Sequence, residues 1–466
     1  MNFTAFISFT CTVCMVICLS SNSVNADTFG NFTYVDRGSS ITITDYPQDA
    51  TGIVDVPATI AGKPVTVIGY KAFARCAGLT HVSIPSGVHR IGHQAFYDCT
   101  NLSSVTIPSS VHNIGDRAFL FCRNLTSVIL PSRVNNIGDK AFYKCTGLTN
   151  VMIPSSVNSI GFNAFSHCDS LETITVNVAN ANYASEDGVL FNRAKTVLLQ
   201  CPAGKKGPLA IPASVTSIAS YAFYFCSGLT NVSIPSSVTS IGDQAFNACT
   251  GLTSVTLSEG VADIGIYSFV NCAGLTNVTI PSSVSSIGHH AFQSCNKLTS
   301  ATFLGDAPAT GTSVFLQHAL GFTVYYQEGS QGFTSPKWRN YQAVALSSAP
   351  EMNVQQPAGS SLVDGTAKKS FGTVAVGVTS SAKTFTVTNT GLSQLKALAV
   401  TVDGEHAADF TVTPMAKTSL APGGQTFFKV TFTPSATGTR RAAVHLTSND
   451  ANENPFDIQL SGMGVR

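Results

Sequence analysis

The chain has 466 residues, enough for two or three ordinary domains. Only 11% of its residues are charged, 44% are hydrophobic, and the formal net charge is +1. The hydrophobic content excludes a disordered chain, and the small net charge argues against a uniform electric field that would attract nucleic acid or an anionic membrane. We expect packed domains whose polar surface consists mainly of Ser, Thr and Asn.

The first 26 residues predict a secretory signal peptide. A mostly apolar run spans Phe6 to Leu19, and Val24-Asn25-Ala26 suits cleavage before Asp27. An N-terminal membrane anchor is the alternative because no Lys or Arg precedes the run, although the run is short for a span of ~20 residues. We therefore expect a secreted or cell-surface protein with no membrane span after signal removal.

A unit of 23 residues then recurs nine times between residues 53 and 305, preceded by an N-terminal cap over 27–52. Its consensus is L-T-x-V-x-I-P-x-x-V-x-x-I-G-x-x-A-F-x-x-C-x-x, and one interval is longer than the others. The unit places a Phe and a Cys at fixed positions that we expect to form a structural ladder. These residues are Phe73, Phe96, Phe119, Phe142, Phe165, Phe223, Phe246, Phe269 and Phe292, with Cys76, Cys99, Cys122, Cys145, Cys168, Cys226, Cys249, Cys272 and Cys295.

Each part of the unit predicts a local structure. In L-T-x-V-x-I-P, apolar residues alternate with polar ones as in a half-buried strand, which the Pro ends. In V-x-x-I-G the chain is expected to turn, with the Gly adopting a positive φ. A-F-x-x-C should place Ala, Phe and Cys on one side of a short helical turn, where Cys acts as a small hydrophobe.

One unit alone buries too little apolar surface to offset the entropy of ordering it, so the units must stack into a solenoid. Stacked cysteines would lie ~4.8 Å apart with parallel Cβ vectors, a geometry unsuited to disulfides. The cysteine content of a secreted chain also fits a disulfide or zinc framework, but no C-x-x-C spacing occurs after residue 26. We expect a column of buried thiols and no metal, with Cys201 outside the column.

These units resemble the BspA-type leucine-rich repeats of bacterial and protist surface proteins, over about Ile53 to Phe303. The resemblance implies an adhesion or binding role at a cell surface or after secretion, and it does not imply an enzyme. The irregular segment 176–212 is similar to an insertion common in that family. It predicts an extra hairpin with strands Gly188–Phe191 and Thr196–Leu199.

The segment Phe303–Tyr341 looks like the closing segment of that family, and we assign residues 306–346 to a C-terminal cap. A terminal cap must cover the last apolar surface of a solenoid. The residues suited to this are Phe322, Tyr325, Tyr326 and Trp338.

Residues 347–368 are rich in Ser, Ala and Pro and are expected to form a linker or the start of the next domain. Residues 369–466 contain the alternating segments SFGTVAVG, KTFTVTNTG, TFFKVTFTP, AAVHLTSND and FDIQLSGMG, which predict a β-sandwich. Over Ser370–Gly464 this region resembles the Hydin-like (ASH) immunoglobulin-like domains and related domains of "choice-of-anchor" surface proteins. The resemblance implies a spacer or supporting module. No sorting tail follows Gly464, so the sequence itself predicts no anchor there.

The sequence contains no GxGxxG, GxxxxGK[ST], HExxH or GxSxG motif. We therefore expect no enzyme, no catalytic residues and no cofactor. His89 and His112 share one repeat position and could seed a metal site, but solvated loop residues are the favoured interpretation, and His93 and His289 share another position in distant repeats. The carboxylates after the repeat Gly are interpreted as caps of the short helical turn: Asp116, Asp139 and Asp243.

The outward positions of the predicted strands form the candidate partner-binding surface, which we call the strand face. This surface is neutral and rich in hydroxyl and amide groups, with two apolar residues, Ile129 and Met152, in adjacent repeats. We hypothesise that an extracellular protein or glycan docks there; an inert solvated surface is the alternative. The strand face comprises His81, Ser83, Ser104, Thr106, Ser127, Ile129, Asn150, Met152, Thr173, Thr175, Asn231, Ser233, Ser254, Thr256, Asn277 and Thr279.

The sequence thus predicts a β-rich leucine-rich repeat solenoid followed by an immunoglobulin-like β-sandwich. The predicted function is a secreted or cell-surface interaction and adhesion protein with a protein or glycan partner and no nucleic acid. The competing interpretation is an envelope or matrix spacer that has no specific ligand and self-associates.

Overall fold

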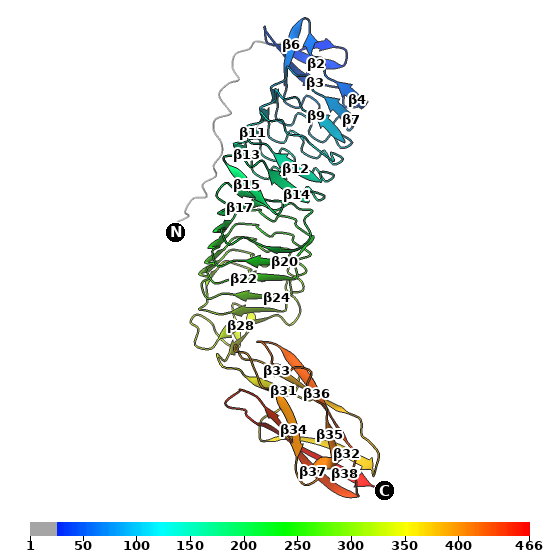
Figure 1. The fold of residues 1–466 in the computed structure, drawn as a ribbon, viewed down its shortest axis with the longest axis vertical. Coiled ribbons are helices and arrows are strands. Elements are labelled where there is room, and N and C mark those ends of the chain that lie inside the picture. Colours follow the sequence, from blue (N-terminus) through cyan, green and yellow to red (C-terminus); the bar gives the residue numbers. More distant parts are fainter. Residues whose placement is uncertain (1–25) are drawn as a thin grey trace.

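The structure is a computed structural model that describes residues 26–466, so the predicted signal peptide lies outside the described residues except for Ala26. Figure 1 shows a long stack of β-coils followed by a separate sandwich at the C-terminal end. This confirms the predicted fold class, a leucine-rich repeat solenoid joined to an immunoglobulin-like domain. Within residues 26–466, no helix is long and apolar enough to span a membrane.

The N-terminal end of the solenoid is covered by an antiparallel sheet of β1 (Asp27–Phe29), β2 (Phe32–Asp36) and β3 (Ile41–Asp45). β3 pairs in parallel with β6 (Lys63–Ile68), which itself pairs with the short β5 (Thr59–Ile60). The ring of Tyr46 lies 5.2 Å from that of Phe73, the first Phe of the ladder. These residues therefore close the apolar end of the stack.

The repeats contribute two-residue strands, formed by the Ile before the repeat Gly and the residue preceding it, to two parallel ladders, one before and one after the insertion. The sequence assigned these residues to a turn, and this is wrong: the residue before Ile and the Ile itself pair in parallel with the same residues of the next repeat. Stacking brings these backbone groups beside their copies, so the ladder satisfies them. Before the insertion these strands are β8 (Arg90–Ile91), β10 (Asn113–Ile114), β11 (Asn136–Ile137) and β13 (Ser159–Ile160). After it they are β19 (Ser217–Ile218), β21 (Ser240–Ile241), β23 (Asp263–Ile264), β25 (Ser286–Ile287) and β27 (Ala309–Thr310).

The repeat Gly is required for close approach and not for a positive φ, which corrects the sequence prediction. A Cβ atom on Gly115 would lie 2.7 Å from the carbonyl carbon of Gly92, and one on Gly138 would lie 2.5 Å from the amide nitrogen of Asp116. Any larger residue here would push two neighbouring repeats apart, because the obstacle is backbone.

The A-F-x-x-C segment forms tight turns in place of the expected short helical turn. The amides of Ala118, Leu120 and Cys122 each donate to the carbonyl three residues earlier, at 3.1–3.2 Å. Arg117 and Phe121, by contrast, have left-handed φ values of 57° and 67°. Left-handed residues at every third or fourth position prevent a helix from continuing.

The longer strands on the opposite side of the repeats form four short sheets, which are parallel except for the antiparallel pair β29–β30 in the fourth. The first holds β4 (Thr51–Asp55), β7 (Gly78–Ser83) and β9 (Ser104–Thr106), and the second β12 (Asn150–Ile153) and β14 (Thr173–Val176). The third holds β18 (Gly207–Ala210), β20 (Leu229–Ile234) and β22 (Ser254–Leu257). The fourth holds β24 (Asn277–Ile280), β26 (Ser300–Phe303), β28 (Thr323–Gln327), β30 (Tyr341–Leu346) and β29 (Lys337–Trp338).

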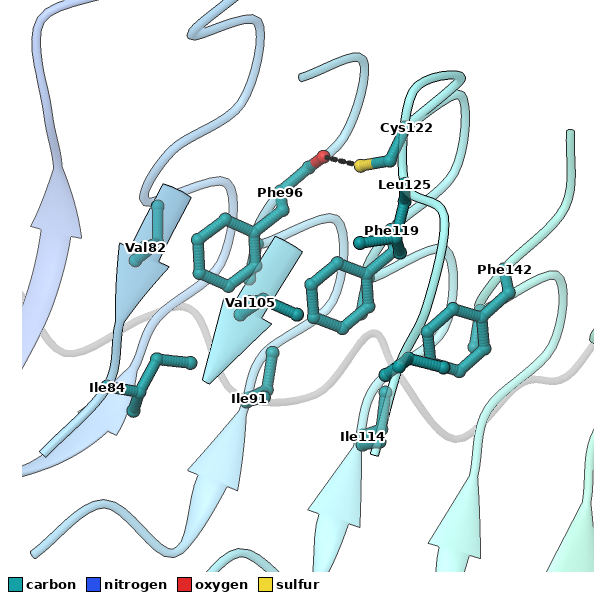
Figure 2. Packing of buried hydrophobic residues seen from close by; sticks show 14 of the residues in the cluster. Val82, Ile84, Ile91, Phe96, Val105, Ile114, Phe119, Cys122, Leu125 and Phe142 are labelled. Carbon is teal, nitrogen blue, oxygen red and sulfur yellow. Dashed lines mark hydrogen bonds between the residues drawn. The ribbon is translucent and has the colours of Figure 1, made fainter. Parts of the chain in front are cut away.

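The recurring Phe rings form the centre of the solenoid. Every ladder Phe is fully buried, and successive rings stack with centroids 4.4–5.4 Å apart within each half. Figure 2 shows three of these rings in file between the strand residues and the ladder Ile residues. Phe315 stacks on Phe292 at 5.5 Å and extends the column by one ring that the sequence analysis missed. The repeat spacing from Phe292 to Phe315 could have revealed it, but Phe315 lacks the Ala and Cys that accompany the other rings.

The ladder Cys residues are buried thiols that also donate hydrogen bonds. The Cys122 thiol donates to the Phe96 carbonyl at 3.1 Å (Figure 2), and the same contact recurs in seven repeats. All ten cysteines among the described residues are free and buried. Burial raises the pKa of the Cys168 thiol to about 12, so the thiol stays protonated at neutral pH.

Cys201, for which the sequence suggested no partner, takes part in the stack. Its carbonyl oxygen lies 3.6 Å from the Cys226 sulfur, and its amide donates to the Ala222 carbonyl at 2.6 Å. The ladder Phe residues make the same two backbone contacts, for example Phe73 with the Ala95 carbonyl. It therefore occupies the place that a ladder Phe holds in a regular repeat.

The insertion contributes the antiparallel strands β15 (Tyr183–Glu186), β16 (Val189–Asn192) and β17 (Val197–Gln200), and β17 starts the second ladder by pairing in parallel with β19. Successive side chains of β16 point to opposite sides, so this strand contributes to two core clusters. Leu190 packs into the cluster before the insertion, whereas Val189 and Phe191 pack into the cluster after it. The insertion thus continues the hydrophobic core.

The last apolar surface of the solenoid is covered by residues after Phe315. Phe322 and Trp338 are each 4% exposed and Tyr326 is 8% exposed, all within the second core cluster, while Tyr325 is half-buried. The indole of Trp338 donates to the Gly332 carbonyl at 3.0 Å, which satisfies its buried N–H.

The C-terminal domain is a sandwich of two four-stranded sheets with a core of its own. One sheet contains β31 (Met352–Gln355), β33 (Lys383–Asn389), β36 (Gln425–Phe432) and β35 (Phe410–Val412). The other contains β32 (Ala367–Ala375), β38 (Phe456–Val465), β37 (Gly438–Thr447) and β34 (Ala399–Asp403), and the short 3-10 helix η1 (Ala407–Asp409) precedes β35. β31 lies within the segment 347–368, and its Met352 and Val354 are buried in the core of the sandwich.

Candidate partner-binding surface

Ile129 and Met152 are the two large apolar side chains that project from the strand face. Ile129 is 83% exposed and Met152 is 61% exposed. Met152 lies on β12, where its neighbours Val151 and Ile153 point inward and are buried. Strand alternation therefore fixes Met152 outward, in register with Thr175 of the next repeat.

Ile129 lies at a gap in the strand face, where the expected strand is absent: none is assigned to residues 127–130. The alternation survives, because Val128 and Leu130 on either side of Ile129 are each only 7% exposed. Core packing thus keeps the segment oriented although the ladder is interrupted. Ile129 consequently stands beside Met152 but belongs to no sheet.

The remaining residues of the strand face are polar and uncharged. His81, Ser83, Ser104 and Ser254 are half-buried, and all the others are exposed. The His81 Nδ1 lies 2.7 Å from the Ser104 hydroxyl oxygen, which ties two adjacent repeats together. The surface therefore offers hydrogen-bonding groups around an apolar pair, without a charge of its own.

The structure brings one of the two histidine pairs together and leaves the other pair apart. The rings of His89 and His112 stack with centroids 5.4 Å apart. Burial, followed by the nearby His112, lowers the pKa of His89, which favours the neutral ring. His93 lies 3.2 Å from a carboxylate oxygen of Asp116, and His289 accepts the Thr312 amide at 3.0 Å, so these two histidines are not brought together.

The carboxylates after the repeat Gly do not cap a turn of their own repeat, which corrects the prediction. Asp116 accepts the amide of Asp139 at 3.0 Å, Asp139 accepts that of Phe162 at 2.7 Å, and Asp243 accepts that of Ile266 at 2.8 Å. Each acceptor is one repeat before its donor, so these side chains tie successive repeats together.

A cleft of about 1020 Å³ lies near the C-terminal end of the solenoid, between the ladder strands β23, β25 and β27 and the loop Trp338–Tyr341. Its carboxylates are already engaged: Asp243 accepts a backbone amide, and Asp263 accepts the Ser286 hydroxyl at 2.6 Å. The Thr312 hydroxyl oxygen, which also lines the cleft, lies 2.9 Å from the Nδ1 atom of His289.

The sandwich contains a carboxylate group that sequence reasoning missed. Ligand atoms of Glu351, Asp450 and Glu453 all lie within 4.8 Å of one another. Asp450 is fully buried and accepts the Met352 amide at 2.6 Å, which links β31 to the loop after β37. Burial, with Glu351 and Asp450 nearby, raises the pKa of Glu453 to about 7. No local pattern reveals this group, because Glu351 is far from the other two in the sequence.

Comparison with protein families identifies both parts of the chain. A model described as "BspA type Leucine rich repeat region (6 copies)" matches residues 66–186 and 207–321, about half of the chain. The chain belongs to the BspA-type leucine-rich repeat family. A second model, "HYDIN/CFA65/VesB-like, Ig-like domain", matches residues 367–463. No curated protein matches the chain at a significant level.

Several solved structures of bacterial proteins are similar to this BspA-type protein. The pneumococcal vaccine antigen PcpA is 21% identical with a TM-score of 0.55, and the match covers 69% of this chain and 98% of PcpA. A leucine-rich cell-surface protein of Faecalibacterium prausnitzii is 28% identical with a TM-score of 0.46, and the match covers 67% of this chain and 97% of the other. A leucine-rich repeat protein of Eubacterium ventriosum is 25% identical with a TM-score of 0.45, over 67% and 96% of the two chains. The likeness to PcpA is one of fold.

Proposed function

We propose that this protein is a non-enzymatic interaction and adhesion protein, secreted or displayed at a cell surface, whose strand face docks an extracellular protein or glycan. Membership of the BspA-type family supports the class of function, and one similar solved structure is described as a leucine-rich cell-surface protein. The sandwich acts as the module that supports the solenoid. Repeat solenoids commonly bind ligands on extended surfaces of this kind.

The observation that supports the docking position is the exposed pair Ile129 and Met152. Two large apolar side chains, 83% and 61% exposed, stand in adjacent repeats on a surface otherwise made of hydroxyl, amide and imidazole groups. Binding surfaces characteristically combine a small apolar centre with a polar rim. We therefore place the centre of the contact at this pair.

The test is a binding screen of the full chain against extracellular matrix proteins and glycans, followed by paired variants. Ile129→Asp with Met152→Asp is expected to weaken binding of a captured partner at least ~tenfold, since a charge would be buried at the centre of the contact. Thr256→Asp with Thr279→Asp adds the same charge at the same repeat position, but farther along the strand face from the apolar pair, and is expected to weaken binding less.

Equal binding by the wild type and the Ile129/Met152 variant would refute the docking position. A screen that detects only self-association would favour the envelope or matrix spacer instead. Both variants change exposed residues, so their melting temperatures should match that of the wild type.

A further inference from the structure

The turns that contain the Phe column have an outer surface whose charge differs before and after the insertion. We call it the turn surface: the residues just before Ala-Phe, just after Phe, and on either side of Cys. After the insertion no charged residue occupies these positions, from Tyr221 to Asn296. Before the insertion they hold six basic residues: Lys71, Arg75, Arg117, Arg123, Lys140 and Lys144. The contrast is large for a chain in which 11% of residues are charged.

A line of aromatic rings runs through the same surface along the solenoid axis; we call it the aromatic ridge. Neighbouring ring centroids along the ridge are 3.9–6.5 Å apart. The ridge also crosses the insertion, since the His167 ring lies 3.9 Å from that of Phe225. Except for His167, its members are half-buried or exposed. It comprises Tyr97, Phe121, Tyr143, His167, Tyr224 and Phe225.

The backbone holds the ridge in a fixed geometry. The amide of Phe121 donates to the Tyr143 carbonyl, and the amide of Lys144 donates to the Ser166 carbonyl, both at 3.0 Å. Each ring and each cation is therefore placed at the repeat spacing without any ligand. Such pre-organisation lowers the entropy that a ligand must offset on binding.

Three of the six cations lie against rings of the ridge. The Lys144 ammonium is 5.5 Å from the Phe121 centroid and 5.9 Å from that of Tyr143, and Lys140 is 5.8 Å from Tyr143. The Arg123 guanidinium is 5.7 Å from the Phe121 centroid. Within residues 26–466, none of the six basic side chains forms an ion pair.

Nearby carboxylates leave an excess of positive charge. Asp98 and Asp169 share the turn surface with the six basic residues. Asp116 and Asp139 lie at its edge, where each accepts a backbone amide of the next repeat. The net positive charge is thus local to the repeats before the insertion, although the whole chain is nearly neutral.

The arrangement of rings and cations indicates a linear ligand. Three of the basic residues directly precede the Ala-Phe pair of their turn: Lys71, Arg117 and Lys140. Arg123 directly follows the Cys of its turn, and Lys144 directly precedes the Cys of the next turn. Cations therefore flank a row of aromatic rings contributed by successive repeats. Sugar rings pack their C–H faces on aromatic side chains, while sulfate or carboxylate groups pair with Lys and Arg. We propose that the turn surface between Lys71 and Phe225 is a second binding site, distinct from the strand face, for an anionic polysaccharide.

Binding to three immobilised polymers tests the proposal: heparin as a sulfated polysaccharide, dextran as a neutral one, and polyglutamate as an acidic peptide. The full chain is expected to bind heparin, with an affinity that falls as salt rises, and not dextran. Lys140→Gln with Lys144→Gln should weaken heparin binding about tenfold. Lys417→Gln with Lys429→Gln in the sandwich changes the same charge at two exposed residues and should leave binding unchanged.

A third variant tests the rings. Phe121→Leu keeps an apolar side chain between the two cations but removes the ring, so heparin binding should weaken while the salt dependence remains. Melting temperatures equal to that of the wild type would show that the variants remain folded.

Three results would overturn the proposal: no heparin binding, equal losses in the turn-surface and sandwich variants, or polyglutamate binding as tight as heparin binding. The last result would mean that charge alone is recognised and would favour an acidic protein partner. Ile129→Asp with Met152→Asp should leave heparin binding intact, so failure of this site and failure of the strand face are distinguishable.

Discussion

The solenoid and the sandwich are both built from β-strands, but different contacts stabilise them. In the solenoid, the residues that contact one another across neighbouring repeats are mostly one repeat apart, as in the thiol hydrogen bonds between Cys122 and Phe96. In the sandwich, contacts join distant segments: the Asp450 carboxylate accepts the amide of Met352, 98 residues earlier.

The two cores also differ in polarity. Among its Phe rings, aliphatic side chains and protonated thiols, the solenoid buries neutral polar side chains such as Asn180 and Ser268, each 0% exposed. The sandwich buries Asp409 and Asp450, which are 2% and 0% exposed. The buried polar groups of the solenoid are thus neutral, whereas the sandwich buries carboxylates that must keep their specific partners. The three following predictions test this difference.

The largest effect is expected from Phe142→Ala. Phe142 is fully buried between Phe119 and Phe165, with ring centroids at 5.2 and 5.4 Å, so its removal leaves a cavity in the middle of the stack. We expect the free energy of unfolding of the solenoid to fall by ~3–5 kcal/mol. Calorimetry should show a lower melting temperature for the solenoid and an unchanged one for the sandwich, which has a separate core. An unchanged solenoid transition would contradict the ladder.

The next largest effect is expected in the sandwich, from Asp409→Asn. Asp409 forms an ion pair with the Arg440 guanidinium and accepts the Ser435 amide at 3.2 Å. Removing its charge leaves the half-buried Arg440 guanidinium without a carboxylate partner, with only its hydrogen bond to the Ser435 hydroxyl, so the sandwich should lose about 3 kcal/mol. The control is Asp403→Asn, whose exposed pair with His445 should contribute less than ~1 kcal/mol. A loss no larger than that of the control would show that the buried pair does not stabilise the domain.

The smallest effect is a pH dependence of opposite sign in the two regions. Burial, with Lys144 nearby, lowers the pKa of His167 from 6.5 to about 4, whereas burial and neighbouring carboxylates raise the pKa of Glu453 from 4.5 to about 7. On acidification from pH 7.5 to 5.5, the solenoid transition should move to lower temperature and the sandwich transition to higher temperature.

The signs follow from proton binding. Between pH 4 and 6.5 the unfolded chain binds more protons at His167 than the native state, so stability is lost as pH falls through this window. Between pH 4.5 and 7 the native state binds more protons at Glu453, so stability is lost as pH rises through this window. His167→Gln and Glu453→Gln should each flatten the pH dependence of one transition only. Parallel shifts of both transitions in the wild type would refute the assignment.

Much of the fold could be predicted because the repeat places equivalent residues on equivalent sites. The Phe and Cys columns follow from the 23-residue period, and the alternating segments of the last hundred residues indicate a sandwich. The candidate strand face followed in the same way, since alternation decides which residues point outward. The strand missing at Ile129 could not be predicted, because its sequence matches the consensus that forms strands elsewhere.

The turn surface was not apparent from composition. The net charge of +1 gives no sign of the six basic residues, because acidic residues elsewhere in the chain balance them. The six belong to several repeats and share one surface only when the repeats stack. The contact between His167 and Phe225 likewise depends on how the insertion closes against its neighbours.

The sequence by itself determined the period of the solenoid, its apolar columns and the presence of a second β-domain, because these are properties of side-chain pattern. Only the tertiary structure decided the role of the repeat Gly, the carboxylates that tie successive repeats together, the place of Cys201 and the ridge across the insertion. Each of these depends on the distance between backbones or side chains of different repeats. Those distances are set when the coils pack against one another, and no local run of residues specifies them.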